Sequence, residues 1–86
     1  MIHVYTQPNC VYCDLICDNL MKWGFEFEKI DITQDPLEKF FLKEMGYKTV
    51  PQLFYKDLNV NSGKNTIELT KDSIVGRMQE IDRHYT

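Results

Sequence analysis

Residues 2–24 have the sequence IHVYTQPNCVYCDLICDNLMKWG, in which a strand pattern gives way to a helix pattern around Cys10 and Cys13. Residues 2–6 are rich in β-branched and aromatic side chains, which predicts a β-strand ending at a Gln-Pro-Asn turn. From Val11 the apolar side chains recur at helical spacing, and Gly24 suits the end of a helix. The residues expected on the inward face of this helix are Cys13, Ile16, Cys17, Leu20 and Met21.

The segment after Gly24 predicts a second strand and a second helix. Residues 25–32 have a strand pattern whose apolar parity switches between Phe27 and Ile30, which indicates a twist, a bulge or burial on both faces. Asp35 is a predicted N-cap with proline at the next position, and Glu38 completes a capping box. The helix should end at Gly46, and its expected apolar face consists of Leu37, Phe40, Phe41 and Met45.

The last third of the chain predicts two strands and a helix. Residues 52–55 and 66–69 are the strands, with turn residues at 61–65 between them. Thr70 can cap the final helix, which turns Ile74, Val75, Met78 and Ile81 inward. The order β-α-β-α-β-β-α predicts a single α/β domain over residues 1–86, with a four-stranded mixed sheet flanked by three helices.

Composition argues against several classes of protein. The chain has 86 residues, a net charge of −3 and no basic block, so we expect neither nucleic acid nor a membrane surface as a partner. No apolar run approaches the ~18 residues of a membrane span. The first residues lack the basic and apolar regions of a signal peptide, which leads us to expect a cytoplasmic protein.

The cysteines carry the chemistry. A Cys-x-x-Cys pair inside a βαβ pattern of a non-secreted chain predicts a redox motif. Cys10 would lie at the helix N-terminus, where unpaired N–H groups and the helix dipole favour a thiolate and lower its pKa below ~8.5. Cys13 would lie within one helical turn of it. We therefore predict that Cys10 is the attacking thiolate and Cys13 the resolving thiol.

Zinc binding is the alternative interpretation of the same cysteines. Zinc needs about four ligands, so Cys17 and either His3 or His84 would have to complete the site. Neither histidine has the spacing of a ligand pair, and Cys17 belongs to the inward stripe of the helix. We predict no metal site, and we expect Cys17 to pack in the core as a free thiol.

Thr49-Val50-Pro51 precedes the third predicted strand. A proline at this point removes a backbone donor from the sheet. It indicates either a cis peptide bond, which occurs mainly before proline, or an ordinary proline at the start of a strand.

These motifs together resemble the dithiol glutaredoxins of the thioredoxin-like superfamily. The matching segments are residues 4–13 with the Cys-x-x-Cys pair, residues 24–27, and residues 46–54 with Thr49-Val50-Pro51. The resemblance implies a thioredoxin-like fold, a cis Pro51, and thiol–disulfide exchange at Cys10 and Cys13. It also implies glutathione as co-substrate, no bound cofactor, and the reduction of glutathione mixed disulfides or protein disulfides, such as that of ribonucleotide reductase. For the oligomeric state, a monomer is the default expectation.

The same resemblance assigns residues to the binding of glutathione. Tyr12 would flank the tripeptide, the backbone of Val50 beside Thr49 and Pro51 would pair with it, and Lys48 or Gln7 would contact a carboxylate. The family's Gly-Gly-x-Asp-Asp stretch has its nearest equivalent at residues 68–72, which makes Thr70 and Asp72 candidate contacts.

Two other functions occur in proteins of this kind. Redoxins of ribonucleotide reductase systems often have valine after the first cysteine, as at Val11, and take electrons from thioredoxin reductase. Their Trp-Ser-Gly-Phe stretch is missing here. Other glutaredoxins hold a [2Fe–2S] cluster with the first cysteine and glutathione, although most of these have glycine or serine where Val11 stands.

Overall fold

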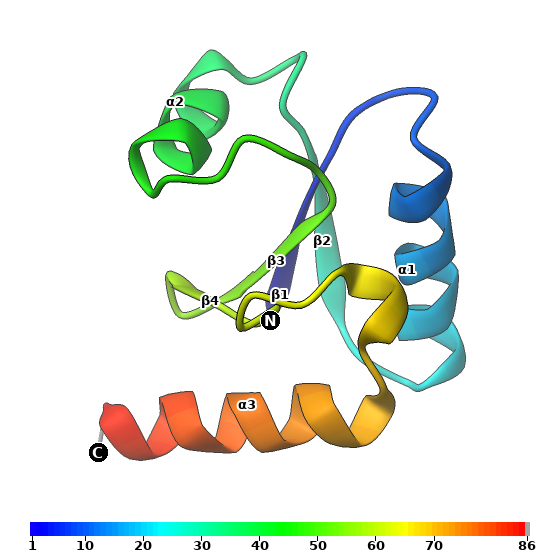
Figure 1. Ribbon diagram of the computed structural model, residues 1–86, viewed down its shortest axis with the longest axis vertical. Coiled ribbons are helices and arrows are strands. Elements are labelled where there is room, and N and C mark those ends of the chain that lie inside the picture. Colours follow the sequence, from blue (N-terminus) through cyan, green and yellow to red (C-terminus); the bar gives the residue numbers. More distant parts are fainter. Residues whose placement is uncertain (86) are drawn as a thin grey trace.

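The computed structural model describes residues 1–85. Within residues 1–85, four strands, three α-helices and one short 3-10 helix follow one another (Figure 1). They are β1 (Ile2–Thr6), α1 (Val11–Lys22), β2 (Phe27–Asp31), α2 (Pro36–Glu44), β3 (Gln52–Tyr55), β4 (Leu58–Asn59), η1 (Thr66–Glu68) and α3 (Lys71–His84).

The strands form one mixed sheet in the order β2-β1-β3-β4. β1 is parallel to β2 and antiparallel to β3, which in turn is antiparallel to β4. Val4 has Lys29 and Leu53 as its register partners on the two sides. The predicted order of elements and the mixed sheet are therefore confirmed.

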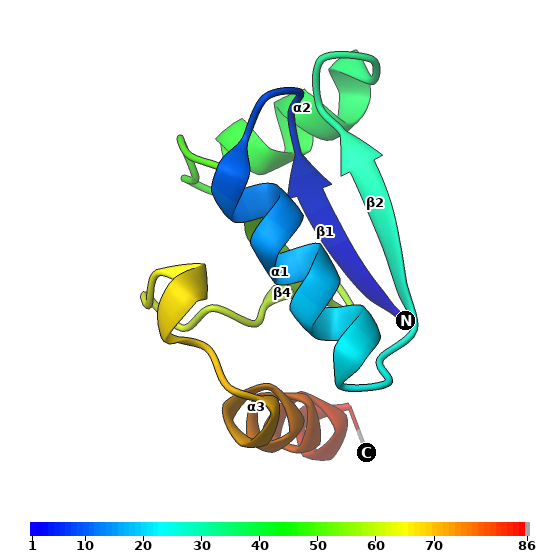
Figure 2. The same cartoon turned by 90° about the vertical axis from the view of Figure 1, so that its right-hand side faces the viewer.

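Each face of the sheet packs against helices (Figures 1 and 2). On one face, side chains of β1 and β3 form a core with α1 and α3 that includes Val4, Leu20, Leu53 and Ile74. On the other face, Tyr5 and Phe54 pack with Leu42 of α2. Successive strand residues point to opposite faces, and both faces are covered.

The parity switch in β2 results from this two-sided burial. Phe27 packs against the core under α1, whereas Ile30 packs against the cluster under α2. Of the three explanations that the sequence allowed, burial on both faces is the one that the structure shows.

The prediction of a fourth strand at residues 66–69 is wrong. β4 instead follows β3 after the two residues Lys56 and Asp57, whose φ angles of 51° and 63° form a tight hairpin turn. Such turns usually carry Asn-Gly, which explains why the pattern missed this one. Residues 66–68 form η1, because the side chain of Asn65 caps it by accepting from the Ile67 N–H at 3.2 Å.

Two predicted helix faces need correction. In α2, Leu37 is 81% exposed and Phe40 62% exposed, and Leu42 is the buried residue. Met21 of α1 is 65% exposed, and Met45 after α2 is also exposed. In both helices the buried face is therefore narrower than the number of apolar residues predicts.

The predicted start of α2 is confirmed in part. The Asp35 carboxylate accepts from the Glu38 N–H at 3.2 Å, and Pro36 occupies the first helical position. The Glu38 side chain does not return to Asp35, because it accepts a hydrogen bond from the Tyr5 hydroxyl at 2.7 Å. This bond ties α2 to the central strand. Burial of the phenol raises the pKa of Tyr5, and the hydrogen bond to Glu38 raises this pKa further.

The last helix is fastened to the hairpin between β3 and β4. Asp82 accepts from the Tyr55 hydroxyl at 2.8 Å and from the Lys56 ammonium at 2.7 Å, and these bonds lower the pKa of Asp82. Thr70 caps α3 as predicted, in a reciprocal pair with Ser73. Within residues 1–85, no helix has both the length and the apolar character needed to cross a bilayer.

Candidate active site

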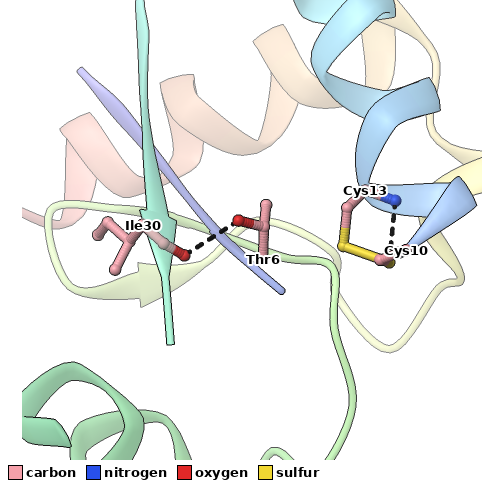
Figure 3. The surroundings of a disulfide bond; sticks show 4 residues. All are labelled: Thr6, Cys10, Cys13 and Ile30. Carbon is pink, nitrogen blue, oxygen red and sulfur yellow. Dashed lines mark hydrogen bonds between the residues drawn. A yellow bond between two sulfur atoms is a disulfide. The ribbon is translucent and has the colours of Figure 1, made fainter. Parts of the chain in front are cut away.

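The site lies where β1 leaves the sheet and α1 begins. Thr6, the last residue of β1, donates its hydroxyl to the Ile30 carbonyl of β2 at 3.2 Å (Figure 3). This bond fixes the end of the strand from which the turn departs. Asn9 then takes a positive φ of 60°, a conformation that asparagine tolerates well, and the chain enters the helix at Cys10.

Cys10 is the N-cap of α1. Its backbone is extended and its sulfur accepts a hydrogen bond from the Cys13 N–H, with a distance of 3.2 Å between Sγ and N (Figure 3). This N–H belongs to the first turn of α1, where it has no backbone acceptor within the helix, and the sulfur is its acceptor. Such a donor stabilises the thiolate more than the neutral thiol.

Cys10 and Cys13 form a disulfide, and their Cα atoms are 5.2 Å apart. The two sulfurs differ in accessibility. Cys13 is 1% exposed, whereas Cys10 is partly exposed at the start of the helix. An incoming disulfide can therefore reach Cys10 more readily than the buried Cys13.

The third cysteine lies deeper in the same helix. Cys17 is a free thiol in the core under α1, and burial raises its pKa. The prediction that Cys17 packs in the core is confirmed. Within residues 1–85, no group of three or more His, Cys, Asp or Glu side chains is placed to hold a metal ion.

Two grooves flank the turn that carries Cys10. The first, of about 650 Å³, has apolar lining residues that include Leu42 and Val50. Gln7, three residues before Cys10, also lines it. Its remaining lining residues are Ile32, Lys39, Lys43, Tyr47, Lys48 and Thr49.

The second groove, of about 460 Å³, begins at Tyr12, two residues after Cys10. It shares Tyr47, Thr49 and Val50 with the first groove, so the two meet along this segment. Its far wall is polar and comes from the end of β4, the loop after β4 and the start of η1. The residues of that wall are Asn59, Asn61, Gly63, Lys64, Asn65 and Thr66.

The segment between the grooves is held by two features. The Val50–Pro51 peptide bond is cis, as the family resemblance implied. Gln52 donates its side-chain amide to the Thr49 hydroxyl at 3.3 Å.

The structure brings most of the predicted glutathione-binding residues to these grooves. Gln7 and Lys48 line the first, Tyr12 and Pro51 line the second, and Thr49 and Val50 line both. Thr70 and Asp72 line neither, because they lie at the start of α3.

The sequence pattern does not predict the polar wall of the second groove. The Asn-Ser-Gly-Lys-Asn stretch has the pattern of a hairpin turn, although its two flanking asparagines are a signal for side-chain bonds to the backbone. Asn61 accepts from the Leu53 N–H at 3.0 Å and thereby fixes the loop beside β3. The hydroxyl oxygen of Thr66 is buried and has no hydrogen-bond partner within residues 1–85.

A sequence model of the glutaredoxin family matches residues 2–60, which include both cysteines and Pro51. The chain belongs to the glutaredoxin family. Glutaredoxin 1 of Rickettsia prowazekii is 33% identical over 86 residues, covering 96% of this chain and 87% of the relative. The glutaredoxin-like protein NrdH of Salmonella typhimurium is 31% identical over 58 residues, covering 67% of this chain and 72% of the relative.

Solved structures agree with this assignment. NrdH-redoxin from Escherichia coli, described as having a thioredoxin-like activity profile, superposes with a TM-score of 0.69 at 25% identity, covering 87% of this chain and 91% of that one. The buckwheat glutaredoxin–glutathione complex has a TM-score of 0.59 at 19% identity, covering 92% and 68% respectively, and shares the fold. The chain is therefore a glutaredoxin-family thiol–disulfide oxidoreductase with a thioredoxin-like fold and a redox-active Cys10–Cys13 pair.

Proposed function

We propose that the chain uses glutathione to reduce glutathione mixed disulfides and protein disulfides. The observation that carries this proposal is the pairing of an accessible Cys10 with two grooves that receive six of the eight predicted glutathione-binding residues. The tripeptide would lie along Thr49 and Val50, beside Tyr12 and Pro51, with its carboxylates near Lys48 and Gln7. A part for Thr70 and Asp72 in binding stays a prediction.

The reaction follows from the two cysteines. The Cys10 thiolate attacks a substrate disulfide, forms a mixed disulfide and releases one substrate sulfur as a thiol. Cys13 then attacks the Cys10 sulfur, which releases the second substrate thiol and leaves the Cys10–Cys13 disulfide. Two glutathione molecules return this disulfide to the dithiol and leave as oxidised glutathione. The Cys13 N–H that now contacts the Cys10 sulfur would stabilise the Cys10 thiolate and lower its pKa.

The substrate would be a protein of a reducing compartment. We propose that the chain acts as a monomer in the cytoplasm, where glutathione keeps thiols reduced. The disulfide of ribonucleotide reductase is one candidate substrate, as the resemblance to the family implies.

A redoxin that takes electrons from thioredoxin reductase is the second candidate. It is favoured by the likeness to NrdH-redoxin, whose described activity profile is thioredoxin-like. It is also favoured by the position of Thr70 and Asp72 outside the grooves, which leaves glutathione without two of its predicted contacts.

A paired reductase assay separates the two candidates. NADPH consumption is followed with the same disulfide substrate, once with glutathione and glutathione reductase and once with thioredoxin reductase alone. We expect turnover in the first arm at millimolar glutathione. Turnover in the second arm only would overturn the proposal in favour of the redoxin. An absorption band in the visible region after anaerobic purification would instead support the [2Fe–2S] alternative.

A further inference from the structure

The charges around the two grooves differ from those of the whole chain. The sequence has 13 acidic and 10 basic residues apart from histidine, yet no Asp or Glu within residues 1–85 lines either groove. Lys39, Lys43 and Lys48 line the first groove and Lys64 lines the second. All four lysines are exposed. None of them is in an ion pair with another side chain of the described residues.

The two cationic grooves are joined across the active-site segment. They share Thr49 and Val50, and the turn containing Cys10 supplies Gln7 to one groove and Tyr12 to the other. In both ribbon views this turn and α2 lie at the same end of the molecule, away from α3 (Figures 1 and 2). A substrate chain whose cysteine reaches Cys10 therefore has a groove on each side of that cysteine, and each groove contains at least one lysine.

From this arrangement we infer that the preferred protein substrate is an extended segment with acidic residues on both sides of its disulfide cysteine. The apolar side chains that line the first groove, Ile32, Leu42, Tyr47 and Val50, would also accept a large apolar side chain. Charge complementarity speeds the encounter of the acidic segment with the lysines and fixes its register along the grooves. The inference rests on the exchange reaction at Cys10, and it holds whichever reductant restores the dithiol.

The exchange with such a peptide is balanced within the cysteine pair. The Cys10 thiolate bonds to the peptide cysteine sulfur and displaces the other sulfur of the peptide disulfide, which leaves as a thiolate and takes up a proton. The Cys13 thiol loses its proton, bonds to the Cys10 sulfur and displaces the peptide thiolate. The protein is oxidised by two electrons and the peptide disulfide is reduced by two.

The test uses four short peptides, each with a central cysteine bound as a disulfide to thiopyridine, so that exchange releases an absorbing pyridine thione. Glutamate residues stand before the cysteine, after it, on both sides or on neither side, and glutamine fills the remaining positions. The pre-reduced protein is mixed with each peptide at low and high salt. We expect the doubly acidic peptide to react about five- to twenty-fold faster than the neutral one at low salt, because exposed charge pairs contribute about two- to five-fold each. Salt should reduce this advantage.

Two lysine variants assign the sides. Lys43→Gln should slow one of the singly acidic peptides by about two- to five-fold, and Lys64→Gln should slow the other. Lys22→Gln, at the exposed end of α1 and outside both grooves, is the matched control and should slow neither. All variants should reduce the uncharged bis(2-hydroxyethyl) disulfide at the wild-type rate.

The outcomes are distinct. Equal rates for the acidic and neutral peptides, or equal losses in Lys22→Gln and the groove variants, would overturn the inference and leave the exchange reaction intact. Failure of the uncharged disulfide to react at all would instead contradict the oxidoreductase activity. Whether glutathione is the reductant does not enter, because every reaction starts from the pre-reduced protein.

Discussion

Helices α1 and α2 begin with the same local hydrogen bond but differ in what the capping atom can do. In both, the side chain of the N-cap residue accepts from the N–H three residues ahead, at 3.2 Å. In α2 the acceptor is the Asp35 carboxylate, and in α1 it is the Cys10 sulfur. The oxygen has one chemical state under ordinary conditions, whereas the sulfur has three: thiol, thiolate and disulfide.

This difference separates stability from reactivity. A carboxylate cap stabilises the helix by satisfying an unpaired N–H and by interacting with the helix dipole. A neutral sulfur is a weak acceptor, so Cys10 contributes little as a cap until it is a thiolate. The N–H that would go to a stronger cap therefore favours the ionised form of Cys10. The N-terminus of α1 therefore has a weaker cap than that of α2 but a more reactive side chain at the cap position.

The largest effect is expected from Cys10→Ser. Serine is among the best N-cap residues, so the variant should fold with stability within about 1 kcal/mol of the reduced wild type. Exchange should nevertheless fall to background, because the hydroxyl cannot form the mixed disulfide. Reduction of bis(2-hydroxyethyl) disulfide with glutathione, measured beside urea unfolding, tests both halves. An active Cys10→Ser beside an inactive Cys13→Ser would reverse the assigned roles.

Cys13→Ser should divide the activity. The bond to the Cys10 sulfur comes from the backbone N–H of residue 13, so serine preserves it. The variant should keep most of its activity on glutathione mixed disulfides, which need only Cys10. It should lose at least about ten-fold on intramolecular protein disulfides, where the resolving thiol must release a trapped substrate. Accumulation of the mixed disulfide with substrate, detected by mass spectrometry, is the direct measurement.

The comparison of helix starts also shows which features a sequence can predict. The strand of residues 2–6, the cysteine pair, the Asp35-Pro36 cap and the Thr70 cap each depend on neighbouring residues, and the structure confirms them. Local hydrogen bonds of this kind are encoded within a few positions. For the same reason, the role of Cys10 could be inferred from its place between a strand and a helix.

The errors concern features that depend on tertiary contacts. The turn at Lys56 and Asp57 lacks the usual glycine, and α3 holds it through Asp82, which is distant in sequence. The Glu38 side chain leaves its expected capping role because Tyr5 of the central strand donates to it. The polar wall of the second groove depends on Asn61 binding the backbone of β3. No local pattern contains these partners.

Cys17 extends the comparison to a cysteine in the interior of the same helix. Cys17→Ser places a hydroxyl in the apolar core, where an unpaired polar group costs about 1–3 kcal/mol, and exchange rates should stay within two-fold of wild type. Guanidinium unfolding beside the exchange assay measures both. A large loss of exchange rate without a loss of stability would give Cys17 a chemical role.

The pH dependence of Cys17 has a defined sign. Burial raises its pKa, so the folded chain keeps this proton at pH values where the unfolded chain has lost it. The contribution is present below the ordinary thiol pKa of ~8.5 and is lost as the pH rises towards the raised value. In the oxidised protein, where Cys17 is the only free thiol, wild-type stability should therefore fall faster than that of Cys17→Ser above about pH 8.5.

The smallest effect is expected on the stability of the start of α2, the helix that was compared with α1 above. Asp35→Ala removes the acceptor of the Glu38 N–H and should lower the free energy of unfolding by about 1 kcal/mol, while exchange with an uncharged disulfide stays within two-fold. Asp35→Asn is the matched control, because asparagine is an equally good cap and should recover most of the stability. Urea unfolding at neutral pH compares the three proteins. If Asn and Ala lose stability equally, the carboxylate acts through its charge on the helix dipole and not as a hydrogen-bond cap. The two helix starts would then not share one physical basis, and the Asp35 cap would not be a model for how the N–H at the start of α1 stabilises the Cys10 thiolate.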